Sequence, residues 1–393
     1  MIVEIGISEL RIGQYVVDIV QQQGTYSLTN AGHVKSEAVI NNLAAKGVET
    51  LLIDTSKTLI EKTKEKNKNP LKKESTTPPP VIREIKKAKK LFNESKEIQK
   101  KVFEDALHGR ELNVAPIMDV AEKTIDTVFK NPDALACVIN IRNKDEYLLE
   151  HSISVSVLMT IFAKYLKIDK QIIHALAVGA FLHDVGKIMV PNEVLNKPSK
   201  LTPEEFEVMK SHVQHSIDII KATPGISELS LEVAALHHEK LDGQGYPYQL
   251  TEDKISTYGR MVTICDIFDA LTAHRCYKKG YNQVKAFSVL RNLAQSGQLD
   301  ARLVDLFIKC MGVYPVGSLV ELNSHKLAIV EERNKEDPTN PKVRSFYSAE
   351  FNRYIMTEDI DLSQTDDFIT KAVRADDFDL DMNRVIEFLL MEG

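Results

Sequence analysis

Seven side chains of the sequence have the chemical types and the spacing of metal ligands. They are five histidines and two aspartates: His151, His183, Asp184, His212, His237, His238 and Asp266. Neutral imidazole nitrogens and ionised carboxylates together suit borderline divalent metals such as iron, manganese or zinc. A metal ion also compensates the charge of a buried carboxylate, which would otherwise be costly. These residues therefore point to a centre that binds divalent metal ions.

The stretch FLHDVGK places His183 beside Asp184 within an apolar run that predicts a buried helix. Adjacent residues of a helix point about 100° apart, so this pair could face two metal positions. A carboxylate such as that of Asp184 could bridge two ions roughly 3.5 to 4 Å apart. At that spacing one ion activates a water for attack on phosphorus while the other stabilises the leaving oxygen. The pattern therefore favours metal-assisted hydrolysis of a phosphate ester.

The stretch LHHEKLDGQGYP ends an apolar helix with His237 and His238 and continues into a loop with two glycines and a proline. These residues predict a tight turn, and glycine permits close approach of the backbone to a ligand. Tyr246 in this loop would offer a ring for stacking and a hydroxyl for donation. A capped helix end explains the glycines but not the paired histidines, so the metal interpretation is favoured.

The stretch GRMVTICDIFDALTAHRCYKKGY carries two aspartates in an apolar helix and then a basic cluster. We interpret Asp266 as a ligand, and Asp269 as a residue that orders the helix or binds a neighbour. Arg275 and Lys278 follow at once and could bind phosphate as a forked and a point-like cation. A solvated helix end explains these two basic residues equally well.

The elements that must position these residues are mainly helices. Apolar residues recur at helical spacing from residue 81 to about 312, which predicts an all-α domain. YVVDIV and TLLID predict strands and SEAVINNLAAKG a helix, so the N-terminus is a small α+β module. Short alternating segments after YPVG predict a β-containing C-terminal extension, and the acidic stretch 357–381 predicts a pair of helices facing solvent or a partner.

The predicted fold class is therefore mainly α, with a helical domain that carries the candidate metal ligands between two small modules. The predicted divisions are 1–55 for the α+β module, 56–80 for a linker, 81–144 for leading helices, 145–313 for the catalytic domain and 314–393 for the extension. The linker is rich in lysine, glutamate, threonine and proline and has almost no large apolar residues, which is typical of a solvated tether.

Composition narrows the function classes. The formal net charge of -6 over 393 residues gives no overall attraction to polymeric nucleic acid or to an anionic membrane. The four cysteines are scattered without a CxxC pair, which favours a reducing, intracellular setting. The N-terminus lacks the pattern of a secretory signal, and no long uninterrupted apolar stretch suggests membrane insertion. We therefore expect a cytoplasmic protein.

Together these stretches resemble the HD-GYP domain, a branch of the HD phosphohydrolase superfamily whose members hydrolyse the bacterial second messenger cyclic di-GMP. HSISVS, FLHDVGK, HHEKLDGQGYP and DIFDALTAHRCYK occur in the family's order, and the resemblance covers roughly residues 145–315. The first 55 residues look like the small N-terminal domain often attached to such proteins, and YPVGSLVELN is similar to the usual C-terminal extension. The resemblance implies a cyclic di-GMP phosphodiesterase whose central part is a helical HD-type metal-dependent phosphohydrolase domain.

Position by position, the resemblance implies two ligand sets that share one aspartate. One metal would be held by His151, His183, Asp184 and Asp266. The second would be held by Asp184, His212, His237 and His238. Tyr147 stands where some members carry a glutamate that supports a third metal, so two ions, iron or manganese, are expected.

The resemblance also implies roles around the metals. Lys187, in the HDxGK signature, would neutralise a phosphate oxygen, although a surface salt bridge explains this lysine equally well from sequence alone. Tyr246 belongs to the GYP loop, and Arg275 and Lys278 match basic residues that contact the substrate. Asp184 and Lys187 would then carry the chemistry, giving pGpG and, after a second cleavage, GMP.

Two other functions stay open at this point. A catalytically weak receptor or scaffold for cyclic di-GMP would use the same fold, with a homodimer or a signalling-protein partner recruited through the N-terminal module. An HD hydrolase of nucleoside triphosphates or guanosine tetraphosphate is the other alternative. The intact ligand set argues against the receptor, and the GYP loop with paired His237 and His238 argues against the other hydrolases.

Overall fold

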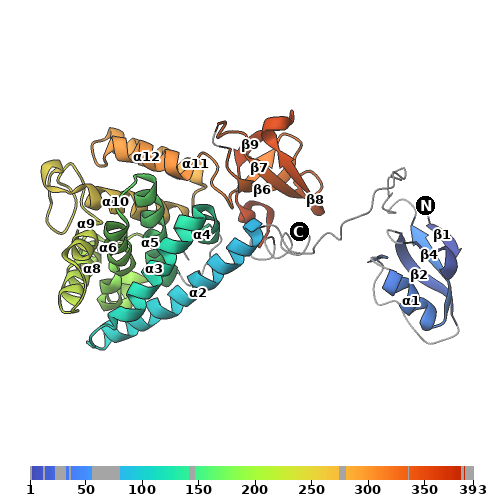
Figure 1. Cartoon of the computed structure of the whole chain (residues 1–393), viewed down its shortest axis with the longest axis horizontal. Helices are drawn as coiled ribbons and strands as arrows, with labels where there is room; N and C mark the ends of the chain where they lie inside the picture. The colour runs from blue at the N-terminus through green and yellow to red at the C-terminus, as the bar shows by residue number, and fades with distance from the viewer. Residues whose placement is uncertain are drawn as a thin grey trace. The chain divides into compact units, whose positions relative to one another are not determined.

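A computed structural model of the chain divides into two compact units, Met1–Thr76 and Thr77–Gly393, which are drawn in Figure 1. The described residues are 2–11, 14–22, 32–34, 37–54, 80–140, 147–273, 280–334, 336–381 and 385. Nearly all of the predicted linker lies outside them, as do Arg275 and Lys278. The predicted fold class, mainly α with a small α+β module and a β-containing extension, is confirmed.

The first unit is a small antiparallel sheet with one helix. Its elements are β1 (Ile2–Gly6), η1 (Ile7–Glu9), β2 (Tyr15–Gln22), β3 (Gly32–His33), α1 (Glu37–Ala45) and β4 (Val48–Asp54). The sheet order is β1-β4-β2-β3, and buried Val16, Leu43 and Leu51 contribute to its core. The two predicted strands and the predicted helix are therefore present, because β-branched alternation and helical spacing were each clear in the sequence.

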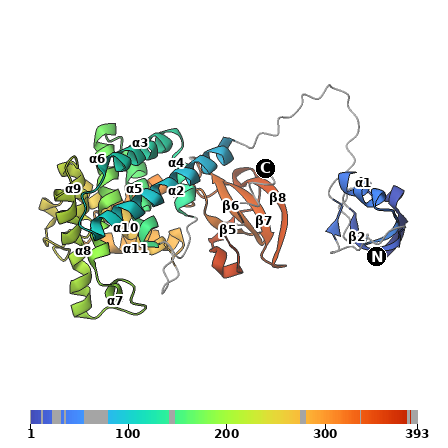
Figure 2. The same cartoon turned by 90° about the horizontal axis from the view of Figure 1, so that it is seen from below.

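The helical part of the second unit surrounds a buried central helix, α5 (Tyr147–Tyr165). Every residue from 151 to 163 is buried, which is possible because other helices pack on all sides. The other helices are α2 (Pro80–Leu107), α3 (Val114–Lys130), α4 (Pro132–Ile139), α6 (Lys170–Leu182), α7 (Asn192–Leu195), α8 (Pro203–Lys221), α9 (Glu228–Leu236), α10 (Thr257–Thr272), α11 (Gln283–Gln295) and α12 (Ala301–Met311). Figure 2 shows the long α2 lying along this bundle.

The apolar run with the adjacent histidine and aspartate is not one continuous helix, which corrects the predicted buried helix. Helix α6 ends at Leu182, and a short 3-10 helix, η4 (Val185–Met189), begins after Asp184. Gly186 explains the close contact of this turn with α8, because a Cβ there would lie 2.2 Å from the His212 carbonyl oxygen. The turn therefore brings Asp184 close to His212 across the bundle.

One stretch of the described residues, Lys170–Met189, is apolar and long enough to cross a membrane by length and composition alone. It comprises α6 and the turn that follows. Buried residues make up 67% of its most apolar window. Packing of α6 against α5, α9 and α3 accounts for this apolar character, as in the core helix of a soluble domain.

The C-terminal extension is a five-stranded antiparallel sheet with the order β8-β7-β6-β5-β9. Its strands are β5 (Leu319–Leu322), β6 (Lys326–Glu332), β7 (Lys342–Ser348), β8 (Arg353–Asp361) and β9 (Ile369–Ala372). The predicted pair of acidic helices at 357–381 is wrong. The stretch instead contains the end of β8, and then β9. Strand β8 pairs with β7, which sets Ile360 opposite Val343, and this pairing stabilises an extended backbone over a helix. Figure 1 shows the sheet at one end of the helical bundle.

Candidate metal centre

The structure brings all seven predicted ligand residues together from five helices or helix ends. His151 lies on α5, the adjacent His183 and Asp184 follow α6, and His212 lies on α8. His237 and His238 follow α9, and Asp266 lies on α10. Six of the seven residues are buried, and the His238 side chain is 23% exposed. The site is therefore inside the bundle and opens to solvent beside His238.

The ligand atoms form overlapping groups around Asp184. In each of three triplets the atoms lie within 4.8 Å of one another: His151, His183 and Asp266; His183, Asp184 and His237; His212, His237 and His238. Oδ2 of Asp184 lies 3.3 Å from Nε2 of His151 and 3.2 Å from that of His183. Oδ1 lies 3.3 Å from Nε2 of His212. Each oxygen of one carboxylate thus faces a different group of imidazoles.

Three of the imidazoles are oriented by the main chain of their own helix. In each ring Nδ1 lies 2.6 Å from the carbonyl oxygen three residues earlier: His183 with Ala180, His212 with Met209 and His237 with Ala234. A carbonyl oxygen only accepts hydrogen bonds, so Nδ1 must carry the hydrogen. The lone pair of each ring is therefore on Nε2, which faces the centre.

His151 is oriented by a side chain instead. Its Nδ1 lies 2.7 Å from Oδ2 of Asp269 and donates to it, which agrees with the prediction that Asp269 binds a neighbour. Nε2 of His151 then directs a lone pair at Oδ1 of Asp266, 3.0 Å away. Two acceptors in such close contact repel each other unless a cation lies between them. Buried Nε2 of His183 and Oδ1 of Asp184 also have no hydrogen-bond partner. This donor set fits divalent metal ions.

Three of the ligand histidines, His212, His237 and His238, are held in their neutral form. Burial lowers the pKa of His212 to about 4 and the pKa of His238 to about 3. Burial, with the neighbouring His238, also holds the pKa of His237 well below its ordinary value. Metal binding requires neutral imidazoles, so these rings need not lose a proton near neutral pH.

The two aspartates are held in the ionised form that metal binding also requires. Burial opposes ionisation, but His183 and Lys187 hold the pKa of Asp184 well below its usual range. Burial also opposes ionisation of Asp266, but the neighbouring His151, His238 and His183 together lower its pKa. The centre thus combines ionised oxygens with neutral nitrogens.

Lys187 lies inside this site and is not a surface residue. Its side chain is 15% exposed, and Nζ lies 2.5 Å from Oδ2 of Asp184. The salt bridge that the sequence left open is therefore present, but it joins Lys187 to the central carboxylate. The ammonium group is consequently within reach of any phosphate held beside Asp184.

The loop after α9 folds back over the centre. The ring centroid of Tyr246 lies 4.6 Å from that of His238. Gly245 permits the fold, because a Cβ there would lie 2.4 Å from the main-chain nitrogen of Lys240. Buried Glu239 accepts hydrogen bonds from the main-chain N–H groups of Tyr248 and Leu250, at 2.7 and 3.0 Å. Sequence reasoning did not identify Glu239, although an acidic residue directly after paired histidines in a turn-rich loop was a signal.

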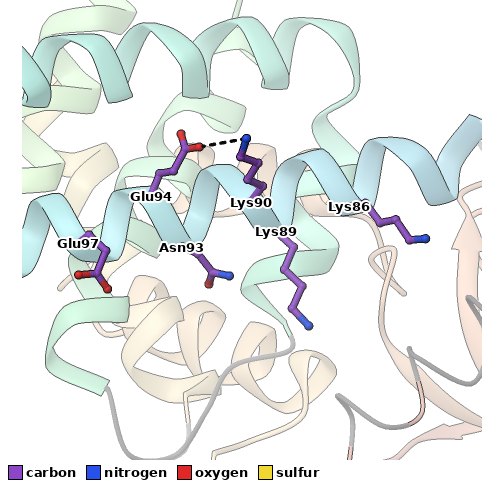
Figure 3. A pocket seen from close by; sticks show the side chains of 6 residues that line it. All are labelled: Lys86, Lys89, Lys90, Asn93, Glu94 and Glu97. Carbon is purple, nitrogen blue, oxygen red and sulfur yellow. Dashed lines mark ion pairs between the residues drawn. The ribbon is translucent and has the colours of Figure 1, made fainter.

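A shallow hollow of about 500 Å³ lies elsewhere, on the exposed face of α2. Its lining residues are Lys86, Lys89, Lys90, Asn93, Glu94 and Glu97. Figure 3 shows these side chains along one face of the helix, with Lys90 directed at Glu94, 3.8 Å away. None of the seven ligand residues lines it, so the hollow is separate from the metal centre.

Two family models match the chain. The HD domain model matches residues 137–303, and the model of a domain of unknown function, DUF3391, matches residues 2–117. The first spans all seven ligand residues. The second runs from the N-terminal sheet through α2 to the start of α3.

Three curated relatives are phosphodiesterases of cyclic dinucleotides. A cyclic di-GMP phosphodiesterase of Pseudomonas aeruginosa is 31% identical over 374 residues, 93% of this chain and 90% of the relative. A 3′3′-cGAMP-specific phosphodiesterase of Vibrio cholerae is 39% identical over 130 residues, 33% of this chain and 24% of the relative. A cyclic di-GMP phosphodiesterase of Thermotoga maritima is 35% identical over 196 residues, 48% and 53% of the two chains. With the gathered ligands and the folded GYP loop, this near-full-length similarity shows that the chain belongs to the HD-GYP family of HD-domain phosphodiesterases.

Proposed function

We propose that the chain hydrolyses the phosphodiester bonds of cyclic di-GMP with a centre of two divalent ions, iron or manganese. The observation that carries the proposal is the position of Asp184. One of its oxygens faces His151 and His183, and the other faces His212. A carboxylate so placed suits two cations better than one. The Pseudomonas aeruginosa relative, similar along 93% of this chain, supports cyclic di-GMP as the substrate.

The two proposed ligand sets share the central carboxylate. The first is His151, His183, Asp184 and Asp266, and the second is Asp184, His212, His237 and His238. When bound, the ions would supply a nucleophilic water near neutral pH and Lewis acidity at the phosphate. The mixture of imidazole and carboxylate ligands suits iron and manganese.

The protein's own side chains would bind and orient the dinucleotide. Lys187, beside Asp184, would stabilise negative charge that grows on the phosphoryl oxygens. Burial raises the pKa of Tyr246, so its hydroxyl keeps its proton and can donate to a phosphate oxygen. Arg275 and Lys278, outside the described residues, would bind phosphate as their counterparts in the family do.

The test combines metal analysis with product analysis. The full chain is purified without oxygen, its iron and manganese are counted, and it is incubated with cyclic di-GMP and, separately, 3′3′-cGAMP. The matched control is Asp184→Asn, which keeps the size of the side chain but removes its charge. We expect about two ions per chain and formation of pGpG, then GMP, by the unmutated protein alone.

Other outcomes give other conclusions. A metal-loaded protein that binds cyclic di-GMP without cleaving it would replace the enzyme by the receptor. Cleavage of 3′3′-cGAMP with cyclic di-GMP left intact would replace the substrate. Equal metal content in Asp184→Asn and the unmutated protein would contradict the shared carboxylate.

A further inference from the structure

An aromatic surface with one cation lies beside the metal centre, at the junction of α8 and the GYP loop. The ring of Phe206 lies 6.2 Å from that of Tyr246, nearly perpendicular to it at 84°. Nζ of Lys210 lies 5.4 Å from the first ring centroid and 5.8 Å from the second. We call these three residues the ring platform.

The ring platform is exposed on the side of Phe206 and packed on the side of Tyr246. Phe206 is 46% exposed and belongs to none of the buried clusters. Tyr246 packs on one side against a small buried cluster that contains Val213 and Ile217, so its ring is held in place. Lys210 is also paired with Glu207, at 2.7 Å. The platform is thus anchored from below, and Phe206 gives it an open apolar edge.

The position of the platform relative to the metal ligands is fixed by one helix. Phe206 and Lys210 lie on α8, which also carries His212. At its other end the platform meets the ring of His238, whose centroid lies 4.6 Å from that of Tyr246. A ligand held by the metals through a phosphate therefore has an aromatic surface directly beside that phosphate.

We propose that Phe206 and Lys210 extend the Tyr246 ring into a stacking surface for a purine base of the substrate. The inference rests on the proposed function and adds two substrate-binding residues to it. Nucleic-acid bases that are not stacked on one another are commonly bound on aromatic rings, and a neighbouring ammonium group strengthens such contacts. Phe206 and Lys210 are not among the metal-binding residues, so loss of either side chain should change KM and not kcat.

The first test is steady-state hydrolysis of cyclic di-GMP by the metal-loaded full chain. Loss of one base–aromatic contact in Phe206→Ala should raise KM about 5- to 150-fold, with kcat and metal content unchanged. Phe206→Trp, which keeps an aromatic face, should restore KM. Val208→Ala is the matched control, because Val208 is 40% exposed on the same helix but points about 200° away from Phe206.

The second test uses the absence of tryptophan from the chain. Phe206→Trp and Val208→Trp each introduce a single fluorescent reporter. Rapid mixing with cyclic di-GMP should quench the fluorescence of the first variant before turnover and leave that of the second unchanged.

The outcomes separate this inference from the proposed function. If the unmutated protein cleaves cyclic di-GMP while Phe206→Ala keeps its KM, the ring platform is only a packing feature. Equal quenching in the two tryptophan variants would likewise overturn it. If the metal-loaded unmutated protein neither binds nor cleaves cyclic di-GMP, the proposed function fails, and this inference fails with it.

Discussion

Two regions of the second unit bury charged side chains, and they do so in opposite ways. In the C-terminal sheet, Arg344 on β7 is 8% exposed and meets Asp359 of β8 through two nitrogens, at 2.5 and 3.0 Å. It also lies 3.1 Å from Glu331 on β6. In the helical bundle, Asp184 is fully buried, yet Oδ1 has no hydrogen-bond partner.

The difference between these regions distinguishes a structural charge from a functional one. The guanidinium of Arg344 is paired with neighbours from the same sheet, so the protein alone compensates its charge. Around Asp184 the nearest atoms are mostly imidazole nitrogens with lone pairs, and Lys187 is the one cation recorded against it among the described residues. The bundle leaves ligand atoms for cations from outside, whereas the sheet is complete without them.

The largest expected effect comes from removing the central carboxylate. Asp184→Asn should lower kcat by about 10³-fold or more, because metal charge stabilisation is worth several kcal/mol. Its metal content should fall as well. The measurement is hydrolysis of cyclic di-GMP beside metal analysis of the same sample. Full activity of Asp184→Asn would show that the buried carboxylate is not needed to bind metal for catalysis.

Acid should destabilise the metal-free bundle through its buried imidazoles. The pKa of His212 is about 4 in the folded protein against an ordinary value of 6.5. The unfolded chain therefore binds a proton between these values while the folded protein does not. The free energy of unfolding is therefore unaffected by His212 above pH 6.5. It falls by about 3 kcal/mol in total as the pH is lowered from 6.5 to about 4.

The check on this pH effect is urea unfolding of metal-free protein across that pH range. His212→Gln serves as the control, because glutamine does not titrate there. If the free energy of unfolding of His212→Gln depends on pH as steeply as that of the unmutated protein, other groups cause the acid sensitivity.

A smaller effect is expected at the residue that orients His151. Asp269→Asn keeps the shape of the side chain but no longer offers an ionised acceptor to Nδ1. Loss of a carboxylate that accepts the Nδ1 hydrogen of a metal-binding histidine typically lowers metal affinity or activity 10- to 100-fold. Titration of metal-free protein with manganese measures the loss of metal affinity. The control is Asp253→Asn at an exposed position, which should leave that affinity unchanged.

The smallest effect belongs to the sheet. Arg344→Met should lower the free energy of unfolding by about 1 to 2 kcal/mol, since its carboxylate partners are partly or mostly exposed and recover water. Thermal unfolding with and without metal tests the comparison. The loss should be the same in both conditions, and kcat should not change.

Most of the ligand residues stand out as polar side chains in otherwise apolar runs, and this contrast is visible without a structure. His212 lies in a polar stretch, so its role is implied by the family resemblance and not by local contrast. The strands and the helix of the first module were equally readable from periodicity. Other features depend on contacts between distant segments. Glu239 gains its role only when the loop returns to it, and the break after Leu182 follows from contact of Gly186 with α8.

The acidic tail shows where a sequence pattern misleads. The charges of residues 357–381 are consistent with a solvated helix, and nothing local excludes that interpretation. The ladder of β8 with β7, and of β9 with β5, decides the outcome. Pairing partners of a strand lie far away along the chain, so local periodicity does not reveal them.

The main-chain contacts of His183, His212 and His237 have a consequence for how the site tolerates mutation. Each ring takes its orientation from a carbonyl oxygen of its own helix. Every residue type supplies a main-chain carbonyl oxygen, so substitution of Ala180, Met209 or Ala234 does not remove the acceptor that orients the ring. His151 depends on the side chain of Asp269 and has no such protection. Position 269 is therefore where a lineage could weaken the centre in one step while every metal ligand stayed intact.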